Sequence, residues 1–194
     1  MSSYLRPTEL DEALSALADG GKTIVAGGTD FYPARVGKPT DEEVLDVTAI
    51  SGLRAIEDRS DHYLIGATAT WTDFICADLP DWFRAMKQAA REVGGVQIQN
   101  AGTIVGNVCN ASPAADGVPG LFALDASVRL ASLSGERDLP IGDFVLGNRK
   151  TARNDDEMVL GLVIPKCGEA AQSAFLKLGA QIFGDFHRHG VCDS

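Results

Sequence analysis

The sequence has too few clustered cysteine and histidine residues to build a metal site. Its four cysteines, Cys76, Cys109, Cys167 and Cys192, lie far apart and lack the close pairs that zinc and iron–sulfur clusters require. The three histidines form no ligand set either. We therefore expect no bound metal, and cysteines that are free thiols in a reducing compartment.

The sequence is also poor in basic charge and in long apolar runs. It has 17 Lys and Arg residues against 27 Asp and Glu residues, a formal net charge of −10. A nucleic-acid partner would need a basic face, which this composition does not provide. No apolar run is long enough to cross a bilayer, and residues 1–4 begin no secretory signal. We expect a cytoplasmic protein without nucleic-acid or membrane partners.

The patterning that is present predicts an α+β protein. Helical spacing predicts a helix that begins at Thr8 and ends at Gly20 and Gly21, a helix that begins at Thr72, and a third helix over 82–93. Strands are expected at 23–26, 43–50, 127–132, 157–164 and 173–178, with a hairpin formed by 53–56 and 63–67. This order divides the chain after residue 52 into a small N-terminal part and a larger part.

Two glycine-bearing turns, each after an apolar run, are the main functional signal. The first is Ala26-Gly27-Gly28-Thr29-Asp30, and the second is Thr103-Ile104-Val105-Gly106-Asn107. A pyrophosphate needs converging backbone N–H groups, and the chain comes close enough only where Cβ is missing and φ is free. The second turn leads into a stretch rich in amide, hydroxyl and carboxylate groups that suits a ribose or ribityl chain. The pair of turns predicts a dinucleotide cofactor.

These turns, the segment 96–102 and the run through Asp116 resemble the FAD-binding medium subunit of molybdenum hydroxylases, the xanthine dehydrogenase and carbon monoxide dehydrogenase group. The resemblance covers Arg6 to Ala180. It implies the two-subdomain FAD-binding fold of the PCMH/VAO-like type, with subdomains 1–52 and 53–180 and FAD in the cleft between them. It also implies that the family's C-terminal α+β domain is lacking.

Carried over by position, the resemblance implies a set of cofactor-binding residues. Asp116 would accept a hydrogen bond from a cofactor hydroxyl, Val159 would pack beside the ring system, and Lys177 would approach its polar edge. From the residues alone, Asp116 is equally well explained as a turn residue and Lys177 as a solvated lysine. The remaining implied residues are Ile24, Val25, Ala26, Gly27, Gly28, Thr29, Asp30, Phe31, Thr103, Ile104, Val105, Gly106, Asn107 and Asn110. No catalytic residue is expected, because flavin chemistry requires no side-chain nucleophile.

Two positions depart from the family pattern. Val105 stands where the family has the first of two glycines, and either its Cβ crowds a phosphate or the backbone keeps φ < 0 there and loses nothing. Gln99 stands where the family usually has arginine. The sequence leaves open whether that position contacts the cofactor or only supports the fold.

Residues 181–194 do not match the family's continuation after Ala180, which is usually a pair of arginines and an apolar strand. With suitable codons, a reading frame shifted by one base would restore such a strand. We hypothesise an out-of-frame tail over 181–194, which the gene sequence tests directly.

The resemblance implies a function in electron transfer. FAD would take electrons from iron–sulfur clusters and pass them to NAD⁺ or another acceptor, with the clusters and molybdopterin carried only by an iron–sulfur small subunit and a molybdenum large subunit. Noncovalent FAD is expected, since Cys109 is the only candidate for a tether near either turn. Two alternatives stay open: a stand-alone FAD oxidoreductase of similar fold, and a truncated, non-catalytic remnant without flavin. Gene neighbours and a yellow colour on purification distinguish them.

Overall fold

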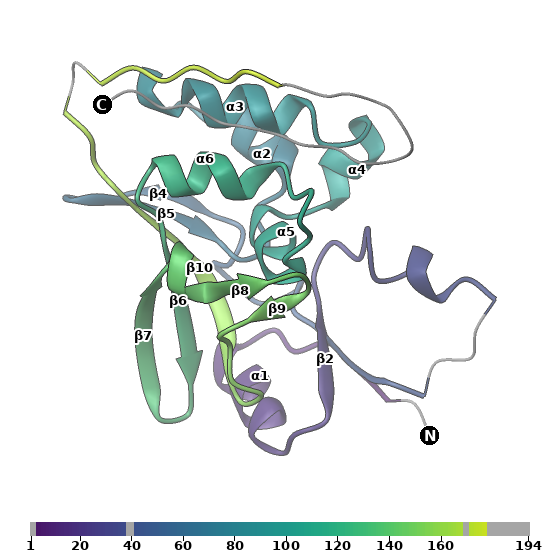
Figure 1. Cartoon of the computed structure of the whole chain (residues 1–194). Coiled ribbons are helices and arrows are strands. Elements are labelled where there is room, and N and C mark those ends of the chain that lie inside the picture. Colours follow the sequence, from purple (N-terminus) through teal and green to yellow (C-terminus); the bar gives the residue numbers. More distant parts are fainter. Residues whose placement is uncertain (1–2, 38–40, 169–170, 178–194) are drawn as a thin grey trace.

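Two larger sheets, a two-stranded ribbon and the helices around them make up the described part of the chain (Figure 1). The computed structural model describes residues 3–37, 41–168 and 171–177. The hypothesised out-of-frame tail, 181–194, lies outside the described residues.

The smaller sheet is parallel and is built from the first part of the chain. Its strands are β1 (Tyr4–Leu5), β2 (Lys22–Val25) and β3 (Glu43–Asp46), and they lie in the order β1-β3-β2. Helix α1 (Leu10–Ala18) connects β1 to β2. The predicted strand 43–50 is too long, because the Asp46 carboxylate accepts hydrogen bonds from the backbone N–H and hydroxyl of Thr48 at 2.8 and 2.6 Å. Those bonds turn the chain away from the sheet.

The first helix also differs slightly from its prediction. It begins after Glu9, which makes no side-chain capping bond, so Thr8 is not its cap. Its end is as predicted: Gly20 and Gly21 follow it with φ of +79° and +73°, a conformation that glycine adopts at little cost.

The larger sheet is antiparallel, in the order β4-β5-β10-β6-β7. Its strands are β4 (Ile56–Asp58), β5 (His62–Gly66), β6 (Ser127–Ser132), β7 (Gly135–Pro140) and β10 (Met158–Pro165). The hairpin, β6 and β10 confirm the predicted elements to within a few residues. Strands β8 (Val145–Gly147) and β9 (Lys150–Thr151), which follow β7 and precede β10 in the chain, pair to form a two-stranded ribbon.

Short helices pack on the larger sheet and join its strands. They are α2 (Trp71–Cys76), α3 (Arg84–Arg91), α4 (Val96–Ala101), α5 (Ile104–Asn110), α6 (Gly117–Ala123) and α7 (Ile141–Phe144), with the 3₁₀ turn η2 (Asp81–Phe83). A further 3₁₀ turn, η1 (Pro33–Arg35), lies between β2 and β3 in the chain. Helix α2 begins at Trp71 rather than at Thr72, because Thr70 and Asp73 form a capping box there.

The predicted strand 173–178 is wrong over its described residues, 173–177. This stretch lies along α3 instead (Figure 1). The Ser173 hydroxyl donates to the carbonyl of Trp82 at 2.8 Å, and the Phe175 N–H donates to the side chain of Gln88 at 3.2 Å. These bonds to η2 and α3 take the place of a sheet partner.

Two hydrophobic clusters form the core. The larger one packs α2, α3, α5 and α6 against the antiparallel sheet and includes the fully buried Trp71 and Phe74. The smaller one packs α1 against β3 and also takes in Ala131 of β6 and Met158 of β10. The two parts of the chain thus share buried contacts, and a boundary after residue 52 stays a prediction.

Candidate functional site

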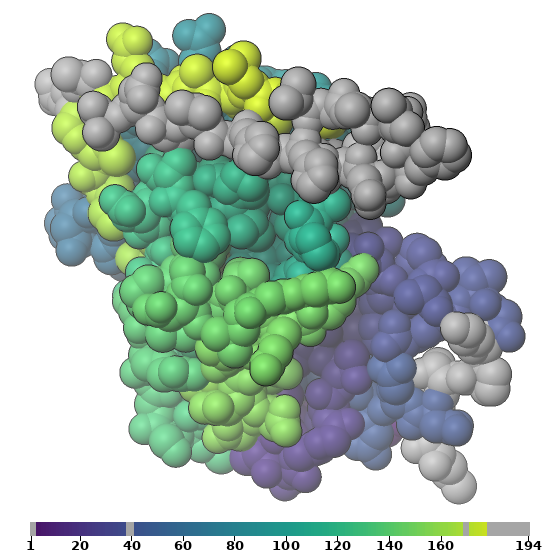
Figure 2. All heavy atoms as spheres, viewed as in Figure 1, coloured from purple at the N-terminus to yellow at the C-terminus, as the bar shows by residue number. Residues whose placement is uncertain are grey.

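A cavity of about 640 Å³ lies where the N-terminal part of the chain meets α4, α5 and the β8–β9 ribbon. Its volume is within the range of small-molecule and cofactor sites. In Figure 2 the surface is recessed where the purple and blue N-terminal residues meet the teal and green ones.

The first glycine turn forms one wall of this cavity. It directly follows β2, and all residues from Ile24 to Phe31 line the cavity. A Cβ on Gly27 would lie 1.9 Å from the carbonyl oxygen of Ala101, so only glycine lets this turn approach the end of α4 so closely. Gly28 has φ of +67°, which reverses the chain.

The backbone of that turn presents free donors. Within the described part of the chain, no N–H group from Gly27 to Phe31 donates a hydrogen bond to another residue. Successive N–H groups around a residue with positive φ form a concave site for anions. The turn therefore offers free donors for an anion, and its contact with a pyrophosphate stays a prediction.

The second glycine turn is different from its prediction, because it is the start of a helix. Thr103 caps α5 with its hydroxyl, which accepts the Gly106 N–H at 2.9 Å. The N–H groups of Ile104 and Asn107 are bonded to the carbonyls of Ala69 and Thr103. A Cβ on Gly106 would lie 2.6 Å from the Thr103 hydroxyl oxygen, so this glycine serves the cap. Most of this segment's backbone donors are already occupied within the fold.

Val105 resolves the alternative that the sequence left open. It lies in the first turn of α5, its φ is not positive, and its side chain is 4% exposed within the larger core cluster. Valine is unstrained there and contributes to packing as well as to the cavity wall.

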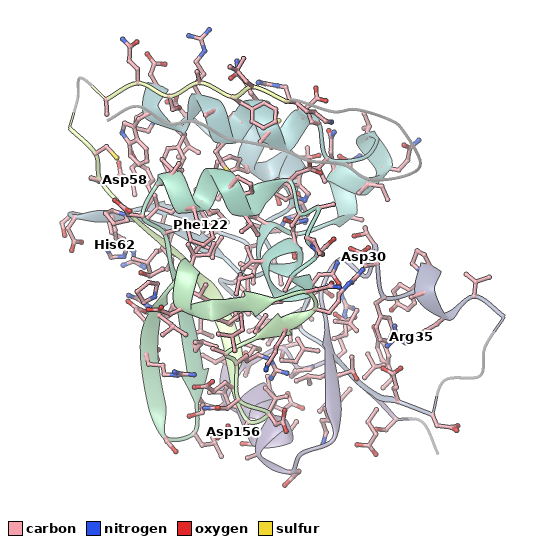
Figure 3. All side chains as sticks on the ribbon, in the orientation of Figure 1. Asp30, Arg35, Asp58, His62, Phe122 and Asp156 are labelled. Carbon is pink, nitrogen blue, oxygen red and sulfur yellow. The ribbon has the colours of Figure 1, made fainter. Side chains whose placement is uncertain are left out.

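A chain of side-chain contacts crosses the mouth of the cavity. The Asn110 amide donates to the Asp30 carboxylate at 3.1 Å, and the Asn110 carbonyl oxygen accepts a bond from Arg149. Figure 3 shows Asp30 beside the tip of the β8–β9 ribbon. Three segments that are far apart in the sequence meet here: the first turn, the end of α5, and the ribbon.

The charge of the cavity wall is opposite to that of the whole chain. Among the described residues, one carboxylate lines it, that of Asp30, against four cationic side chains: Lys22, Arg35, Arg149 and Arg153. Lys22 pairs with Glu43 at 3.7 Å. Arg35 pairs with Glu42 at 2.7 Å and lies 3.7 Å from the Phe31 ring centroid. The local excess of positive charge, in a chain of net charge −10, favours an anionic ligand.

Arg153 is held in place by a buried carboxylate behind it. Glu157, 6% exposed, forms a bidentate ion pair with Arg137 at 2.6 and 2.9 Å and accepts the Asn154 N–H at 2.7 Å. The Arg137 guanidinium holds the pKa of Glu157 below its usual value. This pair fixes the loop that carries Arg153 to the cavity.

The rest of the wall is mainly apolar. It includes Ile98 and the edges of three core residues, Trp71, Val105 and Val159, and such apolar surface suits an aromatic ring. Cys109 also lines the cavity, and burial raises the pKa of its thiol to about 11. At neutral pH it is therefore a protonated thiol and a poor nucleophile.

All but three of the predicted cofactor residues line the cavity. Ile104 is fully buried in the core instead, and Asp116 precedes α6 without lining the cavity. Lys177 lies beside the end of α3, where its ammonium pairs with Glu92 at 3.0 Å. None of these three residues lines the cavity.

Gln99 supports the fold rather than the cavity. Its side-chain amide donates to the carbonyls of Arg91 and Val93, at 3.1 and 3.2 Å, just beyond α3. Arg149 and Arg153 were not predicted from the sequence. The three basic residues that follow Gly147 within six positions, Arg149, Lys150 and Arg153, were a signal that could have indicated them.

The chain is similar to known flavoprotein subunits. The family model described as "FAD binding domain in molybdopterin dehydrogenase" matches residues 1–167. The nicotinate dehydrogenase FAD-subunit of Eubacterium barkeri is 35% identical over 189 residues, covering 90% of this chain and 62% of that protein. The glyceraldehyde dehydrogenase medium chain of Sulfolobus acidocaldarius is 33% identical, covering 84% of this chain and 59% of that protein.

A solved structure of a related enzyme has a chain with the same fold. Carbon monoxide dehydrogenase from Hydrogenophaga pseudoflava contains a chain that superposes with a TM-score of 0.85 at 26% identity, covering 95% of this chain and 66% of that one. This confirms the predicted FAD-binding α+β fold. The chain spans about three fifths of the length of the curated relatives. No helix among the described residues is long and apolar enough to cross a membrane.

Proposed function

This chain belongs to the family of FAD-binding domains in molybdopterin dehydrogenases, and from that premise we propose that it holds FAD noncovalently in the cavity beside the first glycine turn. The free N–H groups of Gly27 to Phe31 would bind the phosphates, and the surfaces of Trp71, Val105 and Val159 would pack against the rings. When bound, FAD supplies the exchange between one-electron and two-electron transfer.

The observation that carries this proposal is the charge of the cavity wall. Lys22 and Arg35 pair with Glu43 and Glu42, but Arg149 and Arg153 form no ion pair within the described residues. Together with the free N–H groups of the first turn, these two guanidinium groups suit a ligand with phosphate groups better than a neutral one. The mixed wall of donors on one side and apolar surface on the other matches a ligand that is both ionic and aromatic.

Titration of the purified chain with FAD tests the proposal. We expect saturable binding of one FAD per chain and, after gel filtration, a flavin absorption band. Thr29→Asp, which places a second carboxylate in the first turn, should weaken FAD binding at least tenfold. Ser134→Asp makes the same charge change in the exposed β6–β7 turn and should change it less than twofold. A folded chain without saturable FAD binding would contradict the proposal.

We also propose that the chain is part of the medium subunit of a molybdenum hydroxylase. The bound FAD would receive electrons from an iron–sulfur small subunit, supplied by a molybdenum large subunit, and deliver them to NAD⁺ or another acceptor. The relatives named as FAD-subunit and medium chain support membership of such a complex. Co-purification with those two subunits, and reduction of the bound flavin by NADH, test the partners and the acceptor separately. FAD-dependent oxidation of a substrate by the chain alone would instead favour a stand-alone oxidoreductase.

A further inference from the structure

Two arginines of the cavity form no ion pair within the described residues, and they indicate which ligand the site selects. We propose that Arg149 and Arg153 bind the diphosphate of FAD and so set the preference of the site for the dinucleotide over riboflavin. This inference rests on the proposed FAD site, and it assigns phosphate recognition to side chains that follow the two glycine turns in the chain.

Arg149 is fixed by its backbone at the mouth of the cavity. It has φ of +55°, an uncommon conformation for a residue with a side chain, and its N–H donates to the carbonyl of Ala111 at 2.8 Å. Ala111 itself has φ of +44° and ends α5. The tip of the ribbon and the end of α5 are therefore locked together, and such local strain is typical of functional sites.

Arg153 is fixed from its side chain. Its guanidinium donates to the backbone carbonyls of Asn154 and Glu157 at 2.9 and 2.7 Å. The buried pair of Glu157 with Arg137 holds that loop. Arg153 thus reaches the cavity wall in a defined orientation, with its position determined before any ligand arrives.

Neither arginine forms an ion pair within the described residues, and the Glu157 carboxylate, which attracts Arg153, is itself paired with Arg137. The partner of Arg149 is the neutral amide of Asn110, and the partners of Arg153 are carbonyls. A guanidinium has five donors in a planar fork, which matches phosphate oxygens, so both groups keep donors for a ligand. By contrast, the other two cations of the wall, Arg35 and Lys22, already pair with Glu42 and Glu43.

The two arginines line the same cavity as the free N–H groups of the first turn, and Asn110 links Arg149 to Asp30 of that turn. Both sets of donors suit phosphate oxygens, and the flavin ring and ribityl chain have no such group. Riboflavin would therefore leave both guanidinium groups without an anion, whereas FAD would neutralise them. This difference predicts a selective, salt-sensitive preference for the dinucleotide.

The test compares FAD with riboflavin on the full chain and on charge variants. Dissociation constants are measured by titration for the wild type, Arg149→Gln, Arg153→Gln and Arg149→Lys. The control is Lys150→Gln, which removes one positive charge from the same ribbon at an exposed residue outside the cavity wall. Thermal melts of each variant identify any that fails to fold. ADP, which carries the diphosphate without flavin, is used as a competitor.

We expect each Arg→Gln variant to bind FAD about tenfold or more weakly, since a charge-assisted hydrogen bond contributes at least that factor. Riboflavin binding should change less than twofold, and Lys150→Gln should match the wild type. Arg149→Lys, which keeps the charge but loses the planar fork, should bind FAD more weakly than the wild type and more tightly than Arg149→Gln. ADP should compete better in the wild type than in the variants. Equal losses for FAD and riboflavin, or unchanged FAD affinity in both variants, would overturn this inference and leave the proposed function standing. Failure of the wild type to bind FAD would overturn both.

Discussion

Replacing Gly27 by alanine tests whether the close approach of the first turn to α4 holds the site together. The added Cβ would lie 1.9 Å from the carbonyl oxygen of Ala101 and 2.9 Å from Cα of Gly102. Both neighbours are backbone atoms, so no side chain can rotate away to relieve the overlap. The turn and the α4–α5 connection must separate instead.

The magnitude follows from the size of that overlap. An ordinary Cβ contact begins at about 3.4 Å, so the backbones must move apart by roughly 1.5 Å at Ala101. Overpacking in a dense interior costs about 1–3 kcal/mol, and a backbone overlap belongs at the upper end of that range. We therefore expect Gly27→Ala to lower the free energy of unfolding by about 3 kcal/mol. For a chain of this length the corresponding loss in melting temperature is about 6–12 °C.

Urea unfolding and FAD titration measure the two consequences. The matched control is Gly168→Ala, because a Cβ there meets nothing within 4 Å and the glycine has no positive φ. We expect the control to behave as the wild type and Gly27→Ala to bind FAD at least tenfold more weakly, since the displaced turn lines the cavity. A Gly27→Ala protein with wild-type stability and FAD affinity would show that the close approach is not needed.

Three further predictions concern single residues. Val105→Gly should not tighten FAD binding but should destabilise the fold by about 2–4 kcal/mol, because it removes a buried side chain and adds glycine to a helix; urea unfolding and FAD titration check this. Glu157→Gln should lower stability at pH 7 by about 1–3 kcal/mol. Pairing with Arg137 lowers the pKa of Glu157, so the ion pair stabilises the fold above the ordinary pKa of 4.5 and this stabilisation is lost as the pH falls below that value. The variant should therefore lose less stability than the wild type between pH 5 and pH 3. Equal losses in denaturation curves would refute this. Bound flavin should be released completely by acid precipitation, because Cys109 stays a protonated thiol, and flavin retained on the precipitate would contradict noncovalent binding.

Elements with a strong local pattern could be predicted from the sequence. The hairpin and β6 alternate apolar and polar residues between clear turns, and they were found within a few residues of their predicted bounds. Helix α4 was missed, because its six residues show no apolar periodicity and Gly95 offers no side-chain cap. The strand predicted at 173–178 failed for a tertiary reason, since η2 and α3 supply its hydrogen-bond partners.

The part of the site that has a local sequence pattern could be predicted, and the part that only the fold assembles could not. The first turn follows a strand and contains adjacent glycines, a local signal that indicated its free donors correctly. The second segment looked like a loop because of Gly106 and Asn107, yet Thr103 caps it as a helix. Arg149 and Arg153 come from a ribbon about forty residues further on, and only the fold brings them to the cavity.

One strand joins the cavity to both hydrophobic clusters. Met158 packs with α1 in the smaller cluster, and the next residue, Val159, packs in the larger one, while both line the cavity. Neighbouring residues of a strand normally face opposite sides of the sheet, and the register of β10 against β6 shifts just after them, between Val159 and Gly161. The wall of the cavity is therefore formed where the two clusters meet, and a ligand that fills it contacts both. Since anything that binds only the folded state stabilises it by mass action, an occupied site holds the N-terminal sheet and the antiparallel sheet together as well as holding the ligand.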